Sequence, residues 1–213
     1  FPAVTHPTTE RVDTRSSRPL PSGRALRWAA GALVLLLCLL VSLDSGADGQ
    51  VPLSLQVRLL ARLGSYDRNF RSRAGAVANV LIVGRKADAD SAFEQSGLAR
   101  ALADVRDIGG VPLHVDEAEL TDPETLAKRC RAERIAVVYL TVGLEAEMPR
   151  LAAALANNDI LTVGTTARHA ENGAVVSFAL EEARPKLIIN LPRARAQNVD
   201  FRAEVLALAR LVK

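Results

Sequence analysis

The sequence is poor in aromatic residues and in cysteine, and both shortages limit what the protein can be. Aromatic residues make up only 4% of the 213, so a core must be built mainly from aliphatic side chains. The two cysteines are Cys38, inside a long apolar run, and Cys130. If the apolar run is cleaved from the chain, Cys38 is lost with it. Cys130 then has no partner, and no internal disulfide can form. We therefore interpret Cys130 as a half-buried helix cysteine rather than a redox-sensing thiol.

A large excess of charge of one sign is also missing. The formal net charge is +3, from 27 Lys and Arg against 24 Asp and Glu. A balance this small gives no basis for expecting nucleic acid or an anionic surface as a partner.

Motifs for catalysis and for cofactors are not found either. A dinucleotide fingerprint needs three glycines so that the backbone can approach a pyrophosphate, and the loop after the first predicted strand has only Gly84. His114 and Asp116 share one face of a predicted strand and could bind a metal, but no third ligand is identifiable nearby. We therefore predict a protein that is not an enzyme and that has no cofactor and no metal site.

Aliphatic sequence is abundant, and its longest run decides the compartment. The sixteen residues from Trp28 to Leu43 carry no charge, Arg24 and Arg27 precede them, and small residues follow. This order is typical of a secretory signal, so residues 24–49 are predicted to be a signal peptide. The alternative is an uncleaved inner-membrane anchor, although the run is slightly shorter than the ~20 apolar residues that span a bilayer. Either interpretation places the downstream chain in the periplasm.

The rest of the chain divides into two parts. Residues 1–23 are rich in Pro, Thr, Ser and Arg and have little apolar content, which predicts a disordered segment. Residues 50–213 have the length and aliphatic content of one domain.

Helical and strand patterns alternate through most of residues 50–213. Leu53, Val57, Leu60 and Leu63 fall at helical spacing and predict a first helix. Strands are predicted at 76–83, 111–115, 135–142 and 159–164, and helices between them at 88–105, 121–131 and 146–156. This alternation with short connections predicts a parallel sheet covered by helices. We therefore expect a Rossmann-like, three-layer α/β domain.

The pattern changes towards the C-terminus. Strands at 174–180 and 186–191 are separated by so few residues that they must form an antiparallel hairpin. A terminal helix over 202–212 is predicted from the spacing of its apolar residues, which places Leu208 on the inward face. By the same reasoning Phe93 lies on the inward face of the 88–105 helix.

Four consecutive residues with hydrogen-bonding side chains follow the first helix, namely Tyr66, Asp67, Arg68 and Asn69. We predict that they form a ligand-binding or partner-binding site. The alternative is that Asp67 and Arg68 tie the end of the helix to the sheet. Two pairs of arginines could hold an anionic ligand or lie on solvated faces: Arg71 with Arg73, and Arg193 with Arg195.

Several stretches of the C-terminal half follow a known pattern. They are Ile160–Val163, Gly173, Phe178, the strand end Leu187–Leu191, Ala194, and the closing Val205–Ala209. Together with the order of elements, they resemble the YfiR-like family of periplasmic proteins over roughly Pro52 to Val212. The most specific feature is the strand that ends in aliphatic residues, Asn190 and Leu191, before the terminal helix.

The resemblance implies a small exported α/β protein that acts by contact. The best-known kind in the family restrains the periplasmic sensing domain of an inner-membrane diguanylate cyclase, and so controls cyclic-di-GMP signalling and biofilm formation. We therefore expect a non-enzymatic regulatory or sensory protein whose partner is a membrane sensor, with a homodimer as a further expectation. The alternative is a periplasmic small-ligand-binding component of a transport or sensor system. That alternative expects a pocket at the carboxyl ends of the strands, near Gly84, Thr141 and Thr165.

Overall fold

Aliphatic side chains alternate between the two faces of the central strands, and this alternation gives the protein two hydrophobic layers. In strand β1 (Ala78–Gly84), Val80 and Ile82 join one buried cluster, whereas Leu81 and Val83 join the other. Successive side chains of a strand point to opposite faces, so a strand that is aliphatic throughout must be covered on both. The structure is a computed structural model that describes residues 50–213. The predicted disordered segment (1–23) and the predicted signal or anchor (24–49) lie outside the described residues.

Eight strands form one sheet in the order β2-β3-β1-β4-β5-β6-β7-β8. Besides β1 they are β2 (Asp107–Ile108), β3 (Val111–Glu119), β4 (Ile135–Leu140), β5 (Leu161–Gly164), β6 (Val176–Glu181), β7 (Arg184–Asn190) and β8 (Arg210–Val212). β3, β1, β4, β5 and β6 run parallel, whereas β6 and β7 are antiparallel. The mostly parallel sheet and the C-terminal antiparallel hairpin are therefore confirmed.

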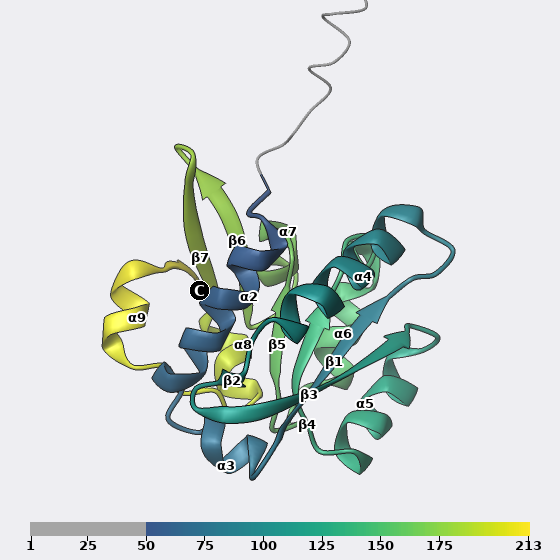
Figure 1. The fold of residues 1–213 in the computed structure, drawn as a ribbon, viewed down its shortest axis with the longest axis horizontal. Coiled ribbons are helices and arrows are strands. Elements are labelled where there is room, and N and C mark those ends of the chain that lie inside the picture. The colour runs from purple at the N-terminus through teal and green to yellow at the C-terminus, as the bar shows by residue number, and fades with distance from the viewer. Residues whose placement is uncertain (1–49) are drawn as a thin grey trace, which may run out of the picture. The chain divides into compact units, whose positions relative to one another are not determined.

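Helices cover both faces of this sheet (Figure 1). They are α2 (Leu53–Leu63), η1 (Gly64–Tyr66), α3 (Phe70–Ala74), α4 (Ala89–Ala103), α5 (Pro123–Ala132), η2 (Glu145–Glu147), α6 (Met148–Ala154), α7 (Ala167–Glu171), α8 (Leu191–Ala196) and α9 (Ala203–Leu208). Helices α2 and α4 pack over one buried cluster, and α5 and α6 over the other. The three-layer arrangement follows from the two-sided strands.

The sequence prediction was wrong about the end of the chain. The terminal helix α9 stops at Leu208, and Arg210–Val212 form the short strand β8 parallel to β7. Ala209 is already extended, because the chain there turns back to complete the edge of the sheet. Leu208, predicted to face inward, is 74% exposed.

The sequence prediction was also wrong about Phe93, which is 71% exposed and does not face inward. The buried face of α4 carries Ser91, Glu94 and Gln95 besides its leucines. These polar side chains are inside because they bond to groups at the strand ends, which rotates Phe93 towards solvent.

Among residues 50–213, no helix combines the length and the apolar character needed to cross a membrane.

Candidate functional site

The predicted segment Tyr66–Asn69 lies between η1 and α3, and its second residue is buried. Asp67 Oδ2 lies 2.6 Å from Nη1 of Arg73, and both side chains are at most 1% exposed. Asp67 also accepts hydrogen bonds from the backbone N–H groups of Asn69 and Asp200. Burying two charges is costly unless their remaining bonds are satisfied. Here they are, since Arg73 also contacts Asp159 and the carbonyl of Asn198.

The next two residues join the same C-terminal segment at the surface. Arg68 donates from Nη1 to both carboxylate oxygens of Asp200, at 3.1 and 3.0 Å. Asn69 donates to the backbone and side-chain oxygens of Asn198. Asp67, Arg68 and Asn69 therefore connect the end of the first helical region to residues 198–201, and their polar atoms are directed at the protein itself.

Tyr66 differs from its three neighbours, because it is 38% exposed and lines a groove. The groove lies between α2, β7 and α9 and has a volume of about 440 Å³. We call it the α2–α9 groove. Its walls are mostly apolar and are formed by Leu55, Leu59, Leu63, Tyr66, Pro185, Leu187, Val205 and Leu208, with Arg62 and Glu204 also lining it.

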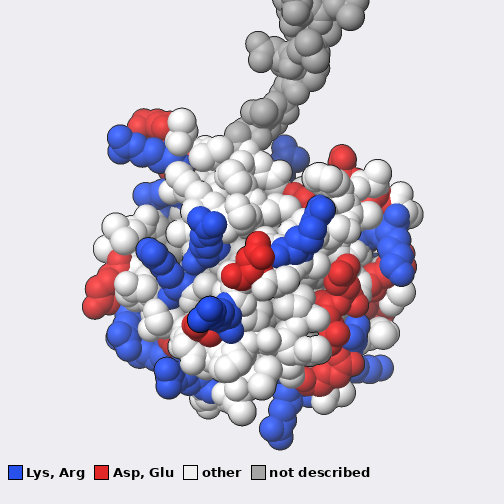
Figure 2. Space-filling view, in the orientation of Figure 1, with Lys and Arg blue, Asp and Glu red and all other residues white. Residues whose placement is uncertain are grey.

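This groove leaves apolar surface in contact with solvent. Leu208 and Tyr66 are two of the four large hydrophobic side chains that are exposed in residues 50–213. Contiguous exposed apolar surface on a small protein marks an interaction site more often than chance would give. Figure 2 shows acidic side chains gathered over the half of this face that carries β3, with a further acidic patch over α9.

The carboxyl ends of β1 and β4 are filled by the start of α4. The order of β3, β1, β4 and β5 places the switch point between β1 and β4, which is where open α/β sheets usually bind ligands. Gly84 and Thr141 end these two strands and both are buried. Ser91 Oγ lies 2.6 Å from Thr141 Oγ1 and accepts from the Arg85 N–H, and a Cβ at Gly84 would lie only 2.9 Å from Gln95 Oε1. The start of α4 thus fills the crevice.

A second set of buried groups closes the adjacent strand end. Glu94 accepts from Thr165 Oγ1 at 2.8 Å and from the Val142 N–H at 2.9 Å. Gln56 donates to the Thr165 carbonyl and accepts from Tyr139 at 3.0 Å. Burial, and then the nearby Glu94 carboxylate, raise the pKa of Tyr139 well above its usual value, so its hydroxyl stays protonated and donates. These groups satisfy one another, and Glu94 and Val142 also line a hollow of about 390 Å³ beside residues 50–53.

His169 is fully buried beside this network. Its Nε2 lies 3.1 Å from the Thr141 carbonyl, and Nδ1 lies 3.0 Å from Thr166 Oγ1. Burial lowers the pKa of His169 below its usual value, although Glu145 at 3.8 Å opposes the shift. The neutral imidazole therefore acts as a structural hydrogen-bonding group.

The remaining candidates lie apart. His114 and Asp116 face each other at 3.4 Å on the solvated side of β3, and residues 50–213 contain no group of three metal-ligating side chains. Burial raises the pKa of Cys130 to about 12, which leaves the thiol protonated and unreactive.

The groove residues Leu55, Leu59 and Leu208 were not predicted from the sequence to form a site. The available signal was a second apolar row on α2, at 55 and 59, beside the row that packs inward.

The fold is shared with solved structures of low sequence identity. A conserved domain protein from Vibrio cholerae O1 biovar El Tor is 16% identical, with a TM-score of 0.52. An ABC domain in complex with L-Trp from Streptococcus pneumonia is 12% identical with a TM-score of 0.55, and a substrate binding protein with adhesive properties from Clostridium difficile is 12% identical with 0.53. They cover 76%, 76% and 68% of this chain, which spans 60%, 60% and 57% of theirs. These likenesses establish the fold class, a Rossmann-like α/β domain.

The family follows from the sequence itself. Residues 65–210 match the profile of the YfiR/HmsC-like family, so the chain belongs to that family. A comparison with curated proteins found no match.

Proposed function

We propose that residues 50–213 are an exported, non-enzymatic regulatory module that acts by direct contact with a membrane-bound signalling protein such as a diguanylate cyclase. The module works in the periplasm, released from its signal peptide or held at the inner membrane. Membership of the YfiR/HmsC-like family supports this proposal. The observation that carries it is the α2–α9 groove, an apolar concavity of about 440 Å³.

The partner segment that fits this groove is apolar with a polar edge. Leu208 and Tyr66 offer the exposed apolar contacts, and aromatic or aliphatic anchors inserted into such pockets provide most of the binding energy in protein interfaces. Arg62 and Glu204 provide one charge of each sign. We therefore assign the groove to a segment of the extracytoplasmic sensing domain of the membrane protein. Tyr66 is the member of the Tyr66–Asn69 segment that contacts the partner, and the other three hold the groove wall.

A ligand-binding component of a transport or sensor system is the alternative. It requires an open concavity near Gly84, Thr141 and Thr165. Gly84, Thr141 and Thr165 are themselves buried, which supports the contact mechanism. The alternative would have to use the neighbouring hollow lined by Glu94 and Val142.

The test is a reconstitution with matched surface variants. The full chain is used to recover an integral membrane protein with an extracytoplasmic sensing domain, and the cyclic-di-GMP output of that protein is then measured with and without the chain. Leu208→Asp places a charge in the groove and is expected to weaken binding at least about tenfold, since a central apolar anchor is lost. Phe93→Asp is the control, because Phe93 is equally exposed but lies outside the groove.

The results of this experiment show whether the groove binds the membrane signalling protein or a second copy of the chain. Loss of restraint with Leu208→Asp and not with Phe93→Asp supports the proposal. Equal loss with both variants, or a cyclase output that the chain does not change, contradicts it. Light scattering on both variants shows whether a second copy of the chain occupies the groove, in which case Leu208→Asp would convert a dimer to a monomer.

A further inference from the structure

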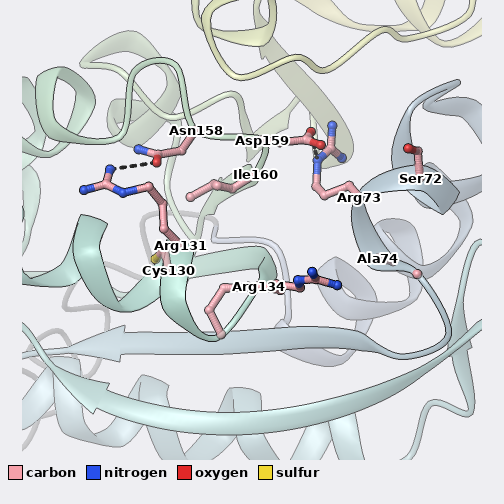
Figure 3. Close-up of a pocket in the computed structure, with 11 residues that line it drawn as sticks. Ser72, Arg73, Ala74, Cys130, Arg131, Arg134, Asn158, Asp159 and Ile160 are labelled. Atoms are coloured by element: carbon pink, nitrogen blue, oxygen red, sulfur yellow. Dashed lines mark hydrogen bonds and ion pairs between the residues drawn. The ribbon is translucent and has the colours of Figure 1, made fainter.

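A second cavity lies at the opposite end of the sheet from the closed crevice. It is formed where β1, β4 and β5 begin, and it has a volume of about 360 Å³, which is within the range of small-molecule sites. Ser72, Arg73 and Ala74 line it from α3, Cys130 and Arg131 from α5, and Arg134, Ile135, Asn158, Asp159 and Ile160 from the segments that lead into β4 and β5. We call it the amino-end pocket. Figure 3 shows its side chains.

Two of its three arginines carry a charge that no carboxylate balances. Arg73 is paired with Asp67 and Asp159, so its charge is compensated. Neither Arg131 nor Arg134 forms an ion pair with any part of residues 50–213. Asp159 is the single carboxylate in the lining, and Arg73 already occupies it. The pocket therefore has an excess of positive charge, which an anion would compensate.

Asn158 fixes one of the two guanidinium groups that lack a carboxylate partner. Arg131 Nη1 donates to Asn158 Oδ1 at 2.9 Å, and Asn158 is itself held by the carbonyl of Ala154 at 3.1 Å. Figure 3 shows the guanidinium of Arg131 beside Asn158, whereas Arg134 reaches to the other side of the pocket, towards Arg73 and Ala74. The arginines thus lie on two sides of the same cavity.

The backbone of Arg134 adds an independent indication. Its φ is +49°, in the left-handed region, at the position just after the end of α5 where helices usually place glycine. An arginine there costs stability relative to glycine. Strained residues of this kind persist at functional sites more often than elsewhere.

Part of the remaining wall is apolar. Ile135, Ile160 and Cys130 are buried and line the pocket beside the arginines. A ligand that uses the whole cavity has an anionic group for the guanidinium groups and an apolar body for this wall. Guanidinium groups bind carboxylates through paired N–H donors.

We propose that the amino-end pocket binds a small carboxylate with an apolar body, which lies between Arg131 and Arg134. The site is separate from the α2–α9 groove and does not rest on the function proposed for it. It gives the regulator a place to respond to a small molecule.

The experiment is calorimetric titration of the full chain, kept in mild detergent, with benzoate as the probe. Benzamide has the same body without the charge, and acetate has the charge without the body. We expect saturable binding of benzoate that is at least about tenfold tighter than that of either control, because both parts of the pocket are used.

Three variants connect binding to the pocket. Arg131→Gln and Arg134→Gln are each expected to weaken benzoate binding by about tenfold to a hundredfold, the range for losing a charged hydrogen-bonding partner. Arg58→Gln removes the same charge from an exposed position of α2 and should leave binding unchanged. Both pocket arginines are exposed, so thermal unfolding is expected to show intact folds. Absence of benzoate binding, binding that acetate or benzamide equals, or binding that survives both substitutions would overturn the proposal.

Discussion

The two ends of the parallel sheet both carry polar side chains but use them in opposite ways. At the carboxyl end, buried Thr165 bonds to both Gln56 and Glu94, and buried Thr141 bonds to Ser91. At the amino end, two exposed guanidinium groups line an open cavity, and neither has a carboxylate partner within residues 50–213. A polar cluster is therefore a site only where its groups remain free to bond.

This contrast reverses the usual arrangement in α/β proteins. Open sheets bind ligands outside the carboxyl ends of their strands because loops and helix N-termini meet there. In this protein Ser91 and Gln95, from the first turns of α4, fill that space. We therefore place the proposed binding sites elsewhere, in the α2–α9 groove and in the amino-end pocket.

Opening the closed end is expected to have the largest effect. Gln56→Leu removes the acceptor of Tyr139 and the donor to the carbonyls of Val51 and Thr165, and leaves three buried groups unpaired. We expect a loss of about 3–5 kcal/mol in the free energy of unfolding, measured in urea. Arg134→Gln, the matched change at the open end, should alter that free energy by less than about 0.5 kcal/mol. Equal losses at both ends would mean that the two ends do not differ as described.

Acid should weaken the closed end specifically. Burial lowers the pKa of His169, so the unfolded chain binds a proton at a higher pH than the folded protein does. The stability from keeping His169 neutral is complete above the unfolded value of about 6.5 and falls as pH decreases below it, by at most about 1.4 kcal/mol per pH unit. Urea unfolding at pH 7.5, 6.5 and 5.5 measures this loss. His169→Gln should show a flatter dependence, and equal slopes for the two proteins would contradict the assignment.

Patterning was sufficient to predict the sheet, because each central strand is a short aliphatic run bounded by turn residues. The hairpin followed from the short gap between its strands. The end of the chain could not be predicted in this way. The spacing of Val205, Leu208 and Val212 fits a helix, and only pairing with β7 draws residues 210–212 into a strand.

The sites were harder to predict than the fold, for a physical reason. The hydrogen-bonding residues Asp67, Arg68 and Asn69 are visible in the sequence, but whether they face a ligand or the protein depends on residues 198–201, more than 125 positions away. Arg131 and Arg134 are only three positions apart, but the cavity that they line forms only when α3 and the segment before β5 pack beside them. Phe93 shows the same limit, because polar residues took the inward face of its helix.

The smallest expected effect distinguishes a strained functional arginine from an accidental one. Arg134→Gly relieves the left-handed backbone at the end of α5, so the free energy of unfolding should rise by up to about 1 kcal/mol. The same variant should lose benzoate binding, because a guanidinium of the amino-end pocket is gone. A gain in stability together with a loss of binding is the pattern that functional strain produces. Arg195→Gly, at an exposed position with ordinary helical backbone in α8, is the control and should lower stability without affecting binding. If Arg134→Gly also lowers stability, the arginine supports the fold, and its backbone gives no reason to assign it to a ligand.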